Sequence, residues 1–251
     1  MTIRRRTIVH DGPGGPFEGV FAWDDAGTTP RSGVLVIPNV LGQKESDNLK
    51  AEALAALGYA AFACDLFGQG KRTQRGEGAS RYMDELNADR ALLRERLRAS
   101  LGALTAQDEV DEANVAAIGF CFGGKCVLDM ARAGLPIRGG VSFHGVYDRP
   151  DWASVNPIAV PLLVCHGWDD PLGPPSALVA LGQELTDARA DWQIHAYGAA
   201  GHAFTDQAMP RGHEGFGYDP KADRRSWRAM SQFLQDAFNN SEIVAGADTA
   251  L

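Results

Sequence analysis

A cysteine flanked by glycines is the residue of this sequence best placed to act as a nucleophile. The segment 119–123 reads Gly-Phe-Cys-Phe-Gly, follows an apolar run at 115–118 and leads into a helix-like stretch. Glycines two positions either side of a nucleophile permit the sharp strand-to-helix turn, the nucleophile elbow, that exposes it at the carboxyl end of a sheet. A helix N-terminus beside the sulfur favours a thiolate. We predict that Cys121 is a catalytic nucleophile; the alternative is a packing turn in which the cysteine is incidental.

A cysteine nucleophile needs a base and an acid that orients the base, and two later loops supply candidates. The apolar run 162–165 is followed by His-Gly-Trp-Asp-Asp, and the run 193–197 is followed by a loop that contains His202. In elbow enzymes the chain order is nucleophile, acid, base. We predict Asp170 as the acid and His202 as the base, and we expect Asp169 to be a turn residue. Structural or solvated roles are predicted for the other histidines, His10, His144, His166, His195 and His213.

The apolar runs that end beside these residues are predicted to be strands of one mostly parallel sheet. Short continuous apolar runs without alternation are typical of strands buried on both faces. They occupy 33–37, 60–64, 115–118, 140–143, 162–165 and 193–197, and helix-like stretches occupy 46–58, 82–104, 123–133, 176–188 and 222–238. Such alternation indicates an α/β fold with helices on both faces of the sheet. Segments 3–10 and 17–23, joined by a glycine–proline turn, are predicted to form an antiparallel hairpin at one edge.

One domain is predicted over residues 1–240, with the hairpin at 1–30, because no linker or change of composition divides the chain. Residues 241–251 lack a core pattern and are expected to form a flexible tail. The net charge of −8 argues against binding to nucleic acid or an anionic membrane. No apolar run approaches the roughly 20 residues of a membrane-spanning helix, and none follows the basic N-terminus as in a secretion signal. We therefore expect a cytoplasmic protein, in which Cys64 and Cys165 are buried free thiols.

Taken together, these motifs resemble the dienelactone hydrolase family, a cysteine-using branch of the α/β-hydrolases. The resemblance extends from about residue 31 to residue 238. Besides the elbow it includes Leu-Gly at 41–42, Gly-Tyr-Ala-Ala-Phe at 58–62, Asp-Leu-Phe-Gly at 65–68, Ser-Phe-His-Gly at 142–145, His-Gly-Trp-Asp-Asp-Pro at 166–171 and Gly-His-Ala-Phe at 201–204. The resemblance implies an α/β-hydrolase fold and a triad of Cys121, Asp170 and His202. It also implies an oxyanion hole made by the backbone N–H groups of Phe122 and Val40.

The sequence departs from the family pattern at two places near the predicted site. Family members carry a glutamate that takes part in activating the cysteine, and Asn39 occupies the matching position. Members that act on dienelactone carry an arginine shortly after the catalytic histidine, where this chain has Thr205 and Asp206. We therefore expect a thiol that stays largely protonated until His202 acts, and a pocket that disfavours carboxylate-bearing lactones. Asn39 is a candidate substrate contact. Arg81 is a candidate cation for the pocket, and the alternative is a solvated residue at the start of a helix.

The favoured hypothesis is hydrolysis of a small lactone or activated ester through a thioester intermediate. A thiolate leaves a tetrahedral intermediate more readily than an alkoxide does, so cysteine suits substrates with good leaving groups. Two alternatives stay open: a general carboxylesterase or thioesterase on neutral substrates, and a catalytically silent domain that binds a ligand. The second alternative stays open because Asn39 replaces the family glutamate, so activation of the thiol could be lost. We expect no metal, no organic cofactor and no nucleic-acid or membrane partner, and an assembly state of monomer or small homo-oligomer.

Overall fold

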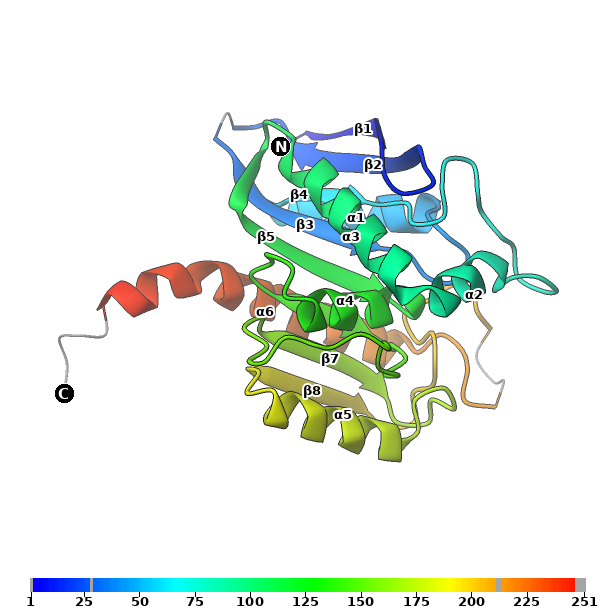
Figure 1. Ribbon diagram of the computed structural model, residues 1–251. Coiled ribbons are helices and arrows are strands. Elements are labelled where there is room, and N and C mark those ends of the chain that lie inside the picture. Colours follow the sequence, from blue (N-terminus) through cyan, green and yellow to red (C-terminus); the bar gives the residue numbers. More distant parts are fainter. Residues whose placement is uncertain (1, 28, 211–213, 247–251) are drawn as a thin grey trace.

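In the computed structural model, which describes residues 2–27, 29–210 and 214–246, eight strands form one sheet (Figure 1). Along the chain they are β1 (Ile3–His10), β2 (Phe17–Asp24), β3 (Arg31–Ile37), β4 (Ala60–Ala63), β5 (Val110–Phe120), β6 (Gly140–Phe143), β7 (Leu162–Gly167) and β8 (Trp192–Tyr197). Their order in the sheet is β1-β2-β4-β3-β5-β6-β7-β8. The pairs β1–β2 and β2–β4 are antiparallel, and all other neighbours are parallel. The predicted edge hairpin and mostly parallel sheet are confirmed.

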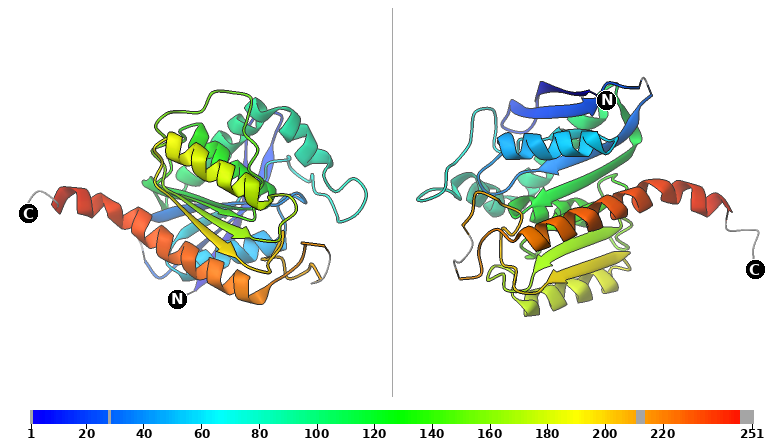
Figure 2. Two further views of the ribbon diagram at one scale, coloured as in Figure 1. Left: turned by 90° about the horizontal axis from the view of Figure 1, so that it is seen from below. Right: turned by 180° about the vertical axis from the view of Figure 1, so that it is seen from behind.

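Helices cover both faces of this sheet, as predicted. They are α1 (Glu45–Ala56), α2 (Arg81–Ala88), α3 (Arg90–Thr105), α4 (Phe122–Arg132), α5 (Pro175–Asp187) and α6 (Pro220–Gly246). Helices α1 and α6 lie on one face, and α3, α4 and α5 lie on the other (Figure 2). None of the helices in the described part of the chain is long and apolar enough to cross a membrane.

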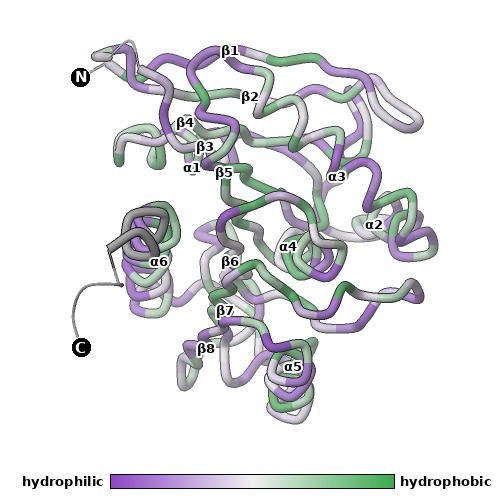
Figure 3. Tube along the Cα trace, turned by 60° about the vertical axis from the view of Figure 1, so that its left-hand side comes forward, coloured by the Kyte–Doolittle hydropathy of each residue, from purple (hydrophilic) through white to green (hydrophobic). Residues whose placement is uncertain are grey.

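The central strands are buried on both faces, which explains their continuous apolar runs. In β3, Leu35 and Ile37 belong to the hydrophobic cluster that α3, α4 and α5 share. The alternate residues Val34 and Val36 belong to the cluster of α1 and α6 on the opposite face. All four side chains are fully buried, and Figure 3 shows hydrophobic residues along the central strands. Two cores on one sheet therefore hold the carboxyl ends of the strands in place.

Two predicted helix boundaries differ in the structure. The single helix predicted over 82–104 is two helices, α2 and α3, because Asp89 leaves the helical conformation with φ −131° and ψ 80°. Its carboxylate accepts a hydrogen bond from the backbone N–H of Leu92 at 2.8 Å and so caps α3. The last helix, predicted over 222–238, continues to Gly246, since no glycine or proline interrupts residues 221–245. The expected tail is therefore helical over 241–246, and residues 247–251 lie outside the described residues.

Candidate active site

Cys121 lies in the turn between β5 and α4, at the edge of the sheet where the parallel strands end. Its backbone has φ 56° and ψ −113°, a conformation that a non-glycine residue rarely adopts. A Cβ on Gly119 would lie 2.1 Å from the carbonyl oxygen of Gly123, and a Cβ on Gly123 would lie 2.3 Å from that of Ile37. Both contacts are shorter than atoms allow. The turn therefore requires glycine at both positions of the elbow.

The imidazole of His202 lies between Cys121 and Asp170. Its Nε2 is 3.0 Å from the Cys121 sulfur, and its Nδ1 is 2.8 Å from Oδ2 of Asp170. The loop after β8 supplies His202, and the loop after β7 supplies Asp170; both side chains are buried. The other oxygen of Asp170 accepts a hydrogen bond from the backbone N–H of Leu172 at 2.8 Å. The neighbouring Asp169 is exposed. The structure thus brings together the three side chains selected from the sequence.

The electrostatics of this group bear on our expectation of a thiol that stays largely protonated until His202 acts. Burial opposes a charged sulfur, but hydrogen bonds from His202 and from the backbone N–H groups of Phe122 and Val40 outweigh it and lower the pKa of Cys121. Burial likewise opposes a charged imidazole, but the hydrogen bonds to Asp170 and Cys121 raise the pKa of His202 to about 10. Both shifts favour a thiolate beside an imidazolium. The expectation considered the missing glutamate; it did not consider the hydrogen bond and charge of His202 or the two backbone donors, which favour the thiolate.

The other three cysteines offer no comparable site. Cys64, Cys126 and Cys165 are buried and free, as predicted for Cys64 and Cys165. Burial raises the pKa of Cys64 and Cys126, and it raises that of Cys165 to about 12. Their thiols therefore stay protonated at neutral pH, and Cys121 is the cysteine whose surroundings favour a thiolate.

Cys121 and His202 open into a cavity of about 1440 Å³. The candidate substrate contact Asn39 lines this cavity. Its Oδ1 accepts hydrogen bonds from the backbone N–H of Leu41 and from Nζ of Lys44, each at 3.0 Å. Asn39 is thus fixed by its own loop and by a lysine at the start of α1. The cavity exceeds the roughly 300–1,000 Å³ of an ordinary small-molecule pocket, so it has room beyond a single small ring.

The candidate cation Arg81 lies outside the residues that line this cavity. It is exposed, and its guanidinium lies 4.3 Å from the centre of the Tyr82 ring. Asp206 does line the cavity, but its Oδ2 is 2.6 Å from Nη2 of Arg75, which lines the cavity as well. The cation beside Asp206 is therefore Arg75. Sequence reasoning missed it because the two residues are 131 positions apart and no motif links them.

Among the other histidines, His144 lies nearest the site. Its ring centre is 5.3 Å from that of His202, and its Nε2 is 2.8 Å from the hydroxyl oxygen of Thr205. Burial, with the charges of His202 and Lys50, lowers the pKa of His144 well below its usual value, which keeps it neutral. His166 lies within a hydrogen bond of Tyr147 at 2.7 Å. The structure thus gives both a polar partner in the core, whereas His213 lies outside the described residues.

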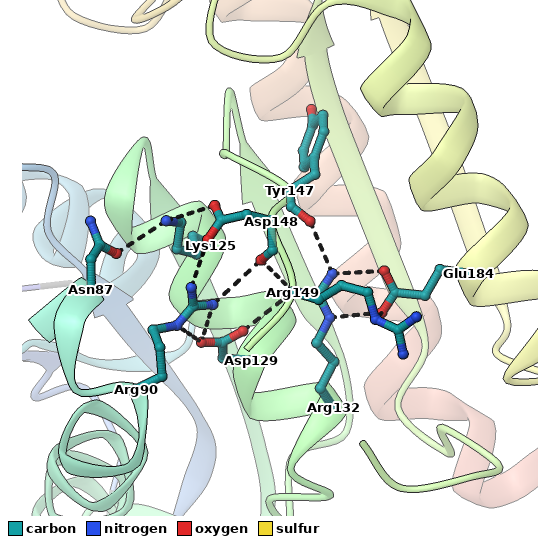
Figure 4. Close-up of polar contacts among 9 residues, drawn as sticks. All are labelled: Asn87, Arg90, Lys125, Asp129, Arg132, Tyr147, Asp148, Arg149 and Glu184. Carbon is teal, nitrogen blue, oxygen red and sulfur yellow. Dashed lines mark hydrogen bonds and ion pairs between the residues drawn. The ribbon is translucent and has the colours of Figure 1, made fainter. Parts of the chain in front are cut away.

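Helix α4, which begins at Phe122 beside Cys121, is held by a mostly buried chain of ion pairs (Figure 4). In order, the chain runs through Lys125, Asp148, Arg90, Asp129, Arg132 and Glu184. Lys125 lies 2.7 Å from Asp148 and also lines the cavity. At the other end Arg132, 1% exposed, binds both oxygens of Glu184 on α5 at 2.9 Å. These pairs tie α4 to α3, to α5 and to the loop after β6. They therefore fix the position of the elbow relative to both neighbouring helices.

A mostly parallel sheet with an elbow after β5, an acid after β7 and a histidine after β8 defines the α/β-hydrolase fold. Within the described residues, no group of three or more histidine, cysteine or acidic side chains is arranged to hold a metal ion. Similarity to known proteins identifies the family within this fold class.

The chain matches the dienelactone hydrolase family over residues 17–238. The solved structure of m3DLH is 37% identical to it, with a TM-score of 0.87 over 94% of this chain and 99% of that one. A dienelactone hydrolase-like promiscuous phosphotriesterase from metagenomic libraries has the same identity and coverage, with a TM-score of 0.86. A Caenorhabditis elegans protein, K02A2.1, is 36% identical over 154 residues, 58% of this chain and 94% of that protein. The chain therefore belongs to the dienelactone hydrolase family.

Proposed function

We propose that this protein cleaves small lactones or activated carboxylic esters through a covalent thioester on Cys121. The observation that carries the proposal is the position of His202, 3.0 Å from the Cys121 sulfur and 2.8 Å from the Asp170 carboxylate. A nucleophile, a base within hydrogen-bond reach and a third group that orients the base are what covalent acyl transfer requires. The family assignment supports a hydrolase, and the cysteine nucleophile supports substrates with good leaving groups.

In the acylation step, the Cys121 thiolate attacks the carbonyl carbon and forms a carbon–sulfur bond. The carbonyl oxygen becomes an oxyanion, which the N–H groups of Phe122 and Val40 stabilise once the sulfur has bonded to carbon. Each such donor contributes about 3 kcal/mol to stabilising the transition state. The carbon–oxygen bond to the leaving group then breaks, and the leaving oxygen takes the Nε2 proton of His202. Asp170 holds the ring so that Nε2 faces the leaving group.

In the deacylation step, neutral His202 takes a proton from water, and the resulting hydroxide attacks the thioester carbon. The carbon–sulfur bond breaks and releases the carboxylic acid product. The sulfur leaves as a thiolate beside the imidazolium, so the starting charges of Cys121 and His202 are restored. The contacts of His202 with Cys121 and with Asp170 are therefore used in both steps of the reaction.

The lowered pKa of Cys121 argues against a catalytically silent domain. Loss of the family glutamate would silence the enzyme only if the thiol lost its activation. Here His202 and two backbone amides provide that activation without a carboxylate at position 39. A general carboxylesterase or thioesterase uses the same three side chains, so the substrate range distinguishes it from a lactonase.

The test is the release of 4-nitrophenol from 4-nitrophenyl acetate by the wild type, with an initial burst that is proportional to the enzyme concentration and does not exceed one 4-nitrophenol per chain. Prior treatment with iodoacetamide abolishes the burst, and Cys121→Ala shows none. A panel of an enol lactone, a neutral alkyl ester, a thioester and a phosphotriester then ranks the substrate classes. The phosphotriester is included because a relative is described as a promiscuous phosphotriesterase. Release of 4-nitrophenol by Cys121→Ala at the wild-type rate would refute the proposal.

A further inference from the structure

An ion pair joins two loops that both line the cavity. Arg75 lies in the loop between β4 and α2, and Asp206 lies four residues after His202. Both loops lie at the edge toward which the parallel strands point (Figure 1). The Arg75 Nη2 donates to Oδ2 of Asp206 at 2.6 Å, and the side chains are 45% and 19% exposed. The pair is therefore open to solvent on the arginine side and faces the substrate space on the other.

The arginine loop is held by Thr73, whose N–H donates to the carbonyl oxygen of Leu41 at 3.0 Å and whose hydroxyl donates to that of Ala79 at 2.7 Å. Between these bonds, open space surrounds two glycines that follow Arg75. The next residue, Gly76, has φ 113°, and Gly78 has φ 74°; a Cβ at either position would meet no atom within 4 Å. Asp206, by contrast, is fixed by its own turn, because its Oδ1 accepts a hydrogen bond from the backbone N–H of Ala208 at 3.0 Å. The carboxylate of Asp206 is therefore held by its own turn, and the long side chain of Arg75, 45% exposed, is the member of the pair that can reach elsewhere.

The lysines of the cavity wall are already paired. Lys44 and Lys50 lie 3.5 Å and 3.6 Å from the buried carboxylate of Asp47, and Lys125 lies 2.7 Å from Asp148. A substrate carboxylate that bound one of these lysines would displace a carboxylate of the protein from a packed position. Arg224 and Arg228 also line the cavity, but they lie on α6. Arg75 differs from all of these cations because its ion pair with Asp206 spans two loops and its side chain is 45% exposed.

We propose that Arg75 is the carboxylate-binding residue of this cavity and that Asp206 keeps it occupied, so that the pair selects neutral esters over esters that carry a carboxylate. The inference rests on the proposed hydrolase function and deepens it by naming the substrate class. Selection works by competition: a substrate carboxylate must displace Asp206 from Arg75, and Asp206 is then left unpaired beside it. Direct repulsion by Asp206 is a different mechanism, because it does not involve Arg75.

The two mechanisms separate in a double-mutant cycle. The substrates are 4-nitrophenyl hydrogen adipate, which carries a free carboxylate, and its neutral methyl ester. The measured quantity is the ratio of kcat/KM for the acid to that for the methyl ester, at low salt. Asp206→Asn keeps the shape of the side chain and releases Arg75, so the ratio rises about tenfold, as expected for one new charge-assisted hydrogen bond. In Arg75→Gln the same Asp206→Asn change alters the ratio by less than about twofold.

Two results would overturn the proposal: an unchanged ratio in Asp206→Asn, or an equal rise in the Arg75→Gln background. The matched control is Glu77→Gln, which removes one negative charge from an exposed position of the loop that carries Arg75. It leaves the ratio unchanged; an equal rise there would show a general effect of net charge and also refute the pair.

A binding measurement keeps this test independent of catalysis. Adipate is titrated by calorimetry into Cys121→Ser and into the same variant with Asp206→Asn, each with and without Arg75→Gln. Asp206→Asn lowers the Kd about tenfold, and only where Arg75 is present. If the wild type hydrolyses neither ester, the proposed function fails, and the adipate affinities still decide whether Arg75 is the carboxylate site that Asp206 occupies. Equal affinities in all four proteins would refute it.

Discussion

Replacing His202 by glutamine tests whether the resting site is an ion pair. With a pKa of about 10, the imidazole is protonated at pH 7 and donates its Nε2 proton toward a sulfur 3.0 Å away. This donation and the lowered pKa of Cys121 favour a thiolate at the sulfur. His202→Gln removes the positive charge and leaves the two backbone donors and a burial that disfavours charge. A cysteine with the ordinary pKa of about 8.5 is only about 3% thiolate at pH 7, so the thiolate population falls by up to about 30-fold.

The assay is the rate of alkylation of Cys121 by iodoacetamide as a function of pH, with the modified residue identified by peptide mass spectrometry. The wild type reacts at neutral pH with an acid limb below the usual thiol range, whereas His202→Gln reacts only as the pH approaches and passes that range. The pKa of His202 is raised, whereas that of Cys121 is lowered, so His202 keeps its proton to higher pH than an ordinary histidine does. The kcat/KM of the wild type is therefore expected to decline as the pH rises through about 10, where the leaving group loses its proton donor.

Equal alkylation profiles for the wild type and His202→Gln would refute the ion pair. The unreacted cysteines provide the internal control, because Cys64, Cys126 and Cys165 are buried with raised pKa values. Their alkylation in either protein would show partial unfolding and not a change in reactivity.

Three further substitutions test the framework of the site. Asp170→Asn lowers kcat/KM by about 10³–10⁴, whereas Asp169→Asn lowers it less than tenfold; a reversed order would show that the acid is misassigned. Gly119→Ala forces a Cβ against the elbow backbone and lowers both Tm and activity. Gly102→Ala, in an open position on α3, raises the free energy of unfolding by about 1 kcal/mol, and equal melting temperatures for the two variants would contradict this reasoning. Arg132→Met leaves two buried carboxylates short of a partner and lowers the free energy of unfolding in urea by about 3–5 kcal/mol; a loss below about 1 kcal/mol would refute a structural role for the ion-pair chain.

The sheet and the positions of the three candidate catalytic side chains could be predicted because their signals are local. A buried parallel strand is a continuous apolar run, and an elbow is a five-residue pattern with a steric cause. The chain order of Cys121, Asp170 and His202 follows once each is placed at the end of such a run. The edge hairpin could also be predicted, from two strand-like segments on either side of a glycine–proline turn.

What the sequence did not reveal depends on contacts between distant segments or on competition between local structures. Asp89 suits a helix interior less well than a cap, and the capping hydrogen bond to Leu92 decided the break between α2 and α3. The protonation state of Cys121 depends partly on the backbone N–H groups of Phe122 and Val40, whose orientation is set by the folded chain. The partner of Asp206 is an arginine 131 residues away. Patterns of residue types do not predict contacts between residues that are far apart in the sequence.

The most direct test of the central claim is the mass of the intact protein, quenched in acid during turnover of 4-nitrophenyl acetate. We expect a fraction of the wild-type chains to gain one acetyl group, about 42 Da, that peptide mapping places on Cys121 and that hydroxylamine removes. Accumulation is greater in His202→Gln after slow acylation, because the base that activates water is absent, and the adduct is missing in Cys121→Ala. Turnover without any adduct on Cys121, or an adduct confined to another residue, would contradict covalent catalysis by this cysteine.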